Sequence, residues 1–79
     1  MTEFYVSLHS VADVRQFVSA ATLTPAEIDV ISGRYTVDAK SIMGIMSLEL
    51  AEPVMVRVYG EEKDGAGFQE EVKNLVVEP

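Results

Sequence analysis

The side chains best suited to covalent chemistry in this sequence are two serines, Ser10 and Ser41, and the single histidine, His9. Each serine directly precedes a segment that is expected to be helical. Serine is a favoured N-cap residue because its hydroxyl accepts a hydrogen bond from a free backbone amide, a contribution of about 1 kcal/mol. A phosphate on Ser41 would also be tolerated, since a helix start carries partial positive charge and phosphorylation adds about −1.5 to −2 charge. Both a structural cap and a modification site therefore fit Ser41.

The segment after Ser41 is unusual for a helix of a soluble domain because it is apolar on two sides. At about 100° per residue, Ile45 and Leu48 share one side. Ile42, Met43 and Met46 lie on another, more than a quarter turn away. A helix on an open sheet buries only one stripe, so we expect the second set to be partly exposed and to form a partner-binding surface. The alternative is that the following loop or a neighbouring subunit covers it.

Other reaction chemistry has little support in the sequence. One histidine, no cysteine and no tryptophan leave few combinations of nucleophile and base. The cluster Glu61, Glu62 and Asp64 lacks the regular spacing of a calcium-binding loop and is expected to be a solvated loop. Gly65 and Gly67 are not followed by the lysine of a phosphate-binding loop. We therefore expect neither enzymatic activity nor a bound metal or cofactor.

The composition indicates one packed domain over residues 1–79, with 48% hydrophobic residues. Thirteen acidic and six basic residues give a net charge of −7, which disfavours nucleic acid and anionic membrane surfaces as partners and favours a basic patch on a protein. The absence of cysteine, of a basic and then apolar leader, and of an apolar stretch of roughly 20 residues predicts a cytoplasmic protein.

The elements that must position these residues follow from the apolar periodicity. Strands are expected over residues 3–8, 26–32, 35–37 and 54–58, with a turn at Gly33 between the second and the third. Helices are expected over residues 10–24, 41–50 and 67–76, with an acidic loop over residues 60–67. The order βαββαβα, with one apolar face on each strand, predicts an α+β open-faced β-sandwich. In it, a four-stranded antiparallel sheet carries three helices on one face.

A resemblance to a known family enters at residues 39–48, Ala-Lys-Ser-Ile-Met-Gly-Ile-Met-Ser-Leu. This segment resembles the regulatory-serine segment of HPr, the phosphocarrier family of the sugar phosphotransferase system, and of its catabolite-repression homologues in low-GC Gram-positive bacteria. Weaker matches cover residues 15–18, the hairpin at residues 32–34 and the glycine-containing segment before the last helix. The resemblance implies the same open-faced sandwich.

The resemblance also implies a regulatory site. It makes Ser41 the target of an HPr kinase/phosphorylase, and its phosphorylated form the ligand of a regulatory protein or transcription factor. The residues that match the family's partner-binding positions are Lys40, Ile42, Met43 and Met46.

The family's second phosphorylation site, a histidine at the start of the first helix that receives phosphate from enzyme I, is not preserved. It lies in a Gly-Leu-His-x-Arg-Pro-Ala motif. Alignment through residues 16–18 places Ser10 at the histidine, Ala12 at the arginine and Asp13 at the proline. An aspartate in the first turn also repels a phosphate at the cap. His9 is one residue too early and is expected to be a surface imidazole.

These observations predict an HPr-like regulatory protein switched by phosphorylation of Ser41, either a monomer or a weak homodimer. Two alternatives remain open. One is a divergent phosphocarrier that relays phosphate through His9 or Ser10. The other is an assembly module in which Ile42, Met43 and Met46 are buried against another chain and no phosphate is involved.

Overall fold

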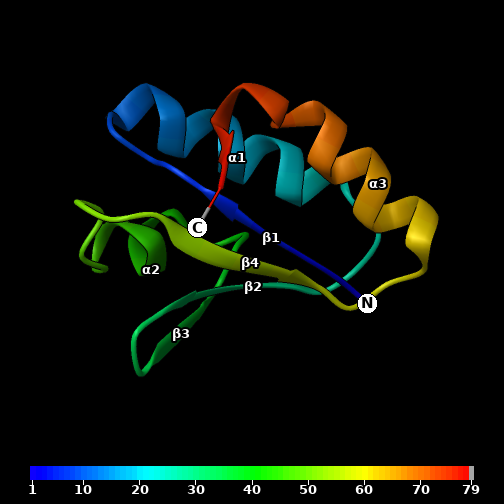
Figure 1. Ribbon diagram of the computed structural model, residues 1–79, viewed down its shortest axis with the longest axis horizontal. Helices are drawn as coiled ribbons and strands as arrows, with labels where there is room; N and C mark the ends of the chain where they lie inside the picture. Colours follow the sequence, from blue (N-terminus) through cyan, green and yellow to red (C-terminus); the bar gives the residue numbers. More distant parts are fainter. Residues whose placement is uncertain (79) are drawn as a thin grey trace.

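The computed structural model describes residues 1–78 and contains a single antiparallel sheet with three α-helices on one face (Figure 1). In chain order the elements are β1 (Thr2–Val6), α1 (Val11–Leu23), β2 (Ile28–Ser32), β3 (Tyr35–Asp38), α2 (Ile42–Met46), β4 (Val54–Val58), α3 (Glu62–Glu71), a 3₁₀ turn (Lys73–Leu75) and β5 (Val76–Val77). The strands are ordered β3-β2-β4-β1-β5, and every neighbouring pair is antiparallel. The predicted α+β open-faced sandwich is confirmed.

The core lies between the sheet and the helices, as the alternation of apolar residues predicts. Phe4, Val56 and Val30 lie opposite one another across β1, β4 and β2, and all three are buried. Phe17 of α1 packs edge to face against Phe68 of α3, with ring centroids 5.3 Å apart. Burying one such side chain contributes roughly 1.5–3 kcal/mol, so these layers hold the helices on the sheet.

The other face of the sheet is not covered by a helix (Figure 1). Tyr5, Met55 and Ile31 form a partly exposed row across it. Beside this row, Arg57 Nε donates a hydrogen bond to Glu3 Oε2 at 2.6 Å. Hydrogen bonding to Tyr59 and to Glu3 raises the pKa of Arg57 above its ordinary value.

The last helix begins five residues earlier than predicted, at Glu62 instead of Gly67. The acidic cluster is therefore a helix start and not a solvated loop: the Glu61 amide donates to Asp64 Oδ2 at 3.1 Å. Gly65, which suggests a loop in the sequence, lies inside the helix where a Cβ would collide with the side chain of Thr2. The glycine thus permits close packing of α3 on β1.

Two further expectations need correction. The second helix ends at Met46 and not at Leu50, because the hydrogen bonds tighten to i→i−3: the Ser47 amide also donates to Gly44 O at 3.2 Å, and the Leu48 amide donates to Ile45 O at 3.0 Å. Leu48 and Leu50 still pack against the core from the irregular connection to β4. The sheet also has a fifth strand, where four were predicted. This strand, β5, pairs with β1 through only two residues, Val76 and Val77.

Candidate functional site

Ser41 is the N-cap of α2. Its Oγ accepts a hydrogen bond from the Gly44 amide at 3.0 Å, and its carbonyl oxygen accepts one from the Ile45 amide at 3.1 Å. The Ser41 amide donates to the carbonyl oxygen of Asp38, the last residue of β3, at 3.0 Å. A Cβ at Gly44 would lie only 3.1 Å from Ser41 Oγ and 3.3 Å from Val37 Cβ. The glycine therefore lets the hydroxyl approach the helix closely.

The side chains of α2 separate into a buried and an exposed set. Ile45 is fully buried, whereas Ile42, Met43 and Met46 are 39%, 81% and 49% exposed. We call these three residues the apolar patch. Their exposure, expected from the helical spacing, is confirmed, and they directly follow the Ser41 hydroxyl. A partner-binding role for them remains a prediction.

Lys40 brings a basic side chain to the same region but is held by backbone interactions. Its Nζ donates to the carbonyl oxygen of Thr24, after the end of α1, at 3.2 Å. Its amide donates to Asp38 Oδ1 at 2.8 Å, which fixes the turn that leads into α2. The carboxylate nearest in sequence to Ser41 is thus already used in a local hydrogen bond.

Ser10 caps α1 in the same manner as Ser41 caps α2. Ser10 Oγ accepts a hydrogen bond from the Asp13 amide at 3.1 Å. In return, Asp13 Oδ2 accepts one from the His9 amide at 3.0 Å, so the two side chains bridge the helix start reciprocally. The Ser10 hydroxyl therefore lies beside a carboxylate held in the first turn of the helix.

The imidazole of His9 is exposed and lies in the connection between β1 and α1. Its Nε2 is 2.6 Å from Ser7 Oγ, and this hydrogen bond turns the ring toward Ser7. Ala12, three residues after His9, carries no charged side chain.

A hollow of about 370 Å³ joins the start of α1 to the end of α2. Ser10 and Val11 line one side of it, and Met46, Glu49 and Leu50 line the other. The sequence does not indicate this connection, because it depends on the path of the chain after α2. Met46 therefore belongs both to the apolar patch and to the hollow beside the start of α1.

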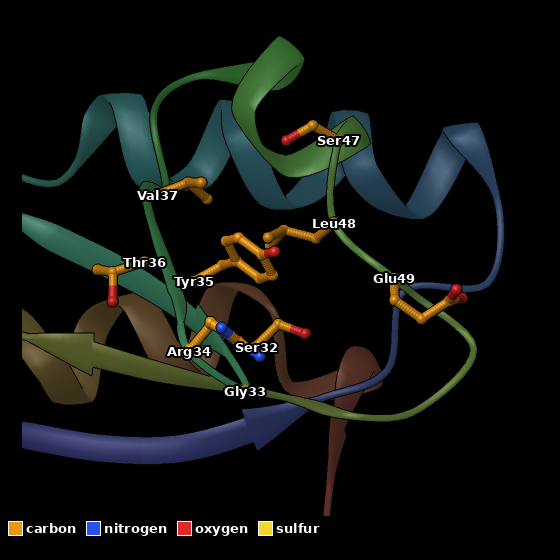
Figure 2. Close-up of a pocket in the computed structure, with 9 residues that line it drawn as sticks. All are labelled: Ser32, Gly33, Arg34, Tyr35, Thr36, Val37, Ser47, Leu48 and Glu49. Atoms are coloured by element: carbon orange, nitrogen blue, oxygen red, sulfur yellow. The ribbon is translucent and has the colours of Figure 1, made fainter.

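A larger hollow of about 730 Å³ lies between the β2–β3 hairpin and residues 47–49. Figure 2 shows the ring of Tyr35 projecting toward Leu48 inside it, with Val37 on the same side of β3. Glu49 lies at the opposite rim (Figure 2).

Two classes of site find no candidates among residues 1–78. No three His, Cys, Asp or Glu side chains gather there in a way that could bind a metal ion. No helix in the same range combines the length and the apolar character that a membrane span requires.

The chain is thus an open-faced α+β sandwich whose first two helices each begin at a serine cap. The sequence model described as "PTS HPr component phosphorylation site" matches residues 11–78, and the chain therefore belongs to the HPr family of the phosphotransferase system. The match begins at Val11, directly after His9 and Ser10.

A comparison with solved structures gives the same relationship. The crystal structure of HPr-C-His from Thermoanaerobacter tengcongensis aligns with a TM-score of 0.76 and 25% sequence identity, covering 94% of this chain and 93% of that chain. A comparison with curated proteins gave no significant match.

Proposed function

We propose that this chain is an HPr-like regulatory protein that is switched by phosphorylation of Ser41 and binds a protein partner through Lys40 and the apolar patch. On this proposal it is a cytoplasmic single domain over residues 1–79 that catalyses no reaction itself. Its partners are a kinase of the HPr kinase/phosphorylase type and a regulatory protein or transcription factor.

The observation that carries the proposal is the position of the Ser41 hydroxyl beside the exposed apolar patch. The first turn of α2, residues 42–44, consists of Ile, Met and Gly and carries no carboxylate. Ser41 is half-buried, and a phosphoryl group there adds about −1.5 to −2 charge at the start of the helix. The phosphate and the patch would together offer a partner an anionic group next to an apolar surface.

The start of α1 is less suited to carry a phosphate than the start of α2, which supports Ser41 as the proposed site. Asp13 lies in the first turn, where a second negative group beside Ser10 is repelled. His9 is hydrogen-bonded to Ser7 and has no neighbouring arginine in its own loop. These features disfavour a carrier that relays phosphate through His9 or Ser10.

The proposal is tested by incubating the protein with HPr kinase/phosphorylase and ATP and measuring the intact mass. We expect one added phosphate, which Ser41→Ala abolishes. The matched control is Ser47→Ala, because Ser47 is a serine of the same segment whose hydroxyl donates to the Gly44 carbonyl. That variant should be phosphorylated like the unmodified sequence.

An ordinary HPr serves as the positive control, and circular dichroism verifies that Ser41→Ala remains folded. If the chain stays unmodified while the control HPr is fully phosphorylated, the proposal is wrong. Phosphate that persists in Ser41→Ala would also reject it.

A further inference from the structure

Strand β3 is an edge strand with an open outer side. It is last in the sheet order, and no other strand of residues 1–78 pairs beyond it (Figure 1). Successive residues of an antiparallel strand direct their backbone groups alternately toward and away from the neighbour. The Ala39 amide donates to the Ile28 carbonyl of β2, so the alternation directs the backbone groups of Thr36 outward. An edge of this kind is a template for another strand.

The sequence of this edge is complementary to itself. The segment consists of β3, residues 35–38, and the turn residue Arg34 that precedes it. When two copies of residues 34–38 run antiparallel about an axis at Thr36, Arg34 of each copy is placed opposite Asp38 of the other. Tyr35 then faces Val37, and Thr36 faces Thr36. Opposite residues point to the same side of a sheet, so the apolar pairs fall on the helix side and the charged pairs on the open face.

We propose that β3 pairs with β3 of a second copy of this chain and joins the two sheets into one. The outward amide and carbonyl of Thr36 would exchange two hydrogen bonds across the axis. The Tyr35 side chain, 65% exposed, would extend over Val37 of the second copy, beside the larger hollow (Figure 2).

The charges at this edge favour a second copy over an unrelated extended peptide. Among residues 1–78, no carboxylate lies within ion-pair distance of Arg34. Asp38 Oδ1 accepts a hydrogen bond from the Lys40 amide, and the other carboxylate oxygen of Asp38 can form an ion pair with an arginine. A net charge of −7 on each copy opposes association, so we expect a weak dimer with a dissociation constant on the order of 0.1 mM.

The proposal is tested by sedimentation velocity over a range of concentrations with two charge reversals. Arg34→Glu places Glu opposite Asp38, and Asp38→Lys places Lys opposite Arg34. Each should weaken self-association about tenfold, because both charged pairs of the dimer become repulsive. Asp38→Lys is the sharper variant, since it lowers the net negative charge and would strengthen association if only overall repulsion mattered.

An equimolar mixture of the two variants should dimerise like the unmodified chain, because both pairs are then again of opposite charge. The matched controls are Arg15→Glu and Glu52→Lys, which make the same charge changes at exposed positions outside β3. They should leave self-association within about twofold of the starting value. Recovery in the mixture shows that each variant is folded.

A third variant tests whether the backbone amide of Thr36 takes part in the dimer. Thr36→Pro removes an outward amide, which does not contribute to the β2–β3 ladder, and should abolish dimerisation while circular dichroism stays unchanged. A chain that remains monomeric at millimolar concentration overturns the proposal, as does a dimer that ignores Arg34→Glu, Asp38→Lys and Thr36→Pro. A dimer that is lost only in Met46→Lys would instead assign self-association to the apolar patch.

Discussion

The starts of α1 and α2 have the same serine cap and an exposed apolar residue directly after it, but they differ in charge and in the length of the helix that follows. Ser10 Oγ and Ser41 Oγ accept hydrogen bonds from the third amide that follows, at 3.1 and 3.0 Å. The start of α1 adds the carboxylate of Asp13, and the helix then runs for 13 residues. The start of α2 adds no carboxylate, and its five residues are followed at once by an irregular connection.

A serine cap alone therefore does not identify a regulatory site. The cap hydrogen bond contributes about the same free energy of folding at both positions. The neighbouring groups make the difference, namely a fixed negative charge beside Ser10 and exposed apolar side chains beside Ser41. Within one chain, the start of α1 thus combines a cap with a fixed negative charge, and the start of α2 combines a cap with the exposed apolar patch.

The largest expected effect concerns how α2 is attached. Ile45 is its only buried residue, whereas α1 buries Val14, Phe17 and Ala21. Ile45→Ala should lower the free energy of unfolding by about 2–4 kcal/mol, because it leaves a cavity under α2. Urea denaturation followed by circular dichroism measures this.

Met43→Ala is the matched control for that loss, because Met43 belongs to the same helix and is 81% exposed. It should change stability by no more than about 0.5 kcal/mol. Equal effects of the two variants would mean that α2 is not anchored through Ile45.

A smaller effect is expected from removing the two caps. Ser10→Ala and Ser41→Ala should each cost about 1 kcal/mol, because each leaves one amide of the first turn without its acceptor. The same denaturation experiment measures both. A loss at Ser10 with none at Ser41 would break the equivalence of the caps and would mean that α2 does not depend on the Ser41 hydroxyl.

The smallest effect concerns the charge at the start of α1. Asp13→Asn keeps an oxygen acceptor for the His9 amide but removes the negative charge that favours a helix start, so stability should fall by about 0.3–0.5 kcal/mol. The loss should shrink at high salt, where this interaction is screened. A variant as stable as the original at low salt would show that the charge of Asp13 plays no part in holding α1.

The sequence predicts those parts of the fold in which periodicity and local turn chemistry agree. Apolar residues at every second position fix the inner face of β1 and β4, and Gly33, with φ of 60°, supplies the turn of the β2–β3 hairpin. The helical spacing after Ser41 correctly separates buried Ile45 from the exposed apolar patch.

The remaining features depend on contacts between distant segments. Gly65 suggests a loop because glycine is a poor helix former, yet its position is set by the packing of α3 against Thr2. The spacing of Glu61 and Asp64 was the one local signal for the true helix start. Strand β5 is too short to show periodicity, and the hollow between α1 and α2 follows from the path of the connection after Met46.

The most direct test offers both phosphoryl donors to the same protein. One sample receives HPr kinase/phosphorylase with ATP, the other receives enzyme I with phosphoenolpyruvate, and peptide mass mapping under neutral conditions locates the phosphate. We predict phosphate on Ser41 in the first sample and an unmodified chain in the second. Phosphate on His9 or Ser10, with Ser41 left unmodified, would contradict the assignment of the two helix starts.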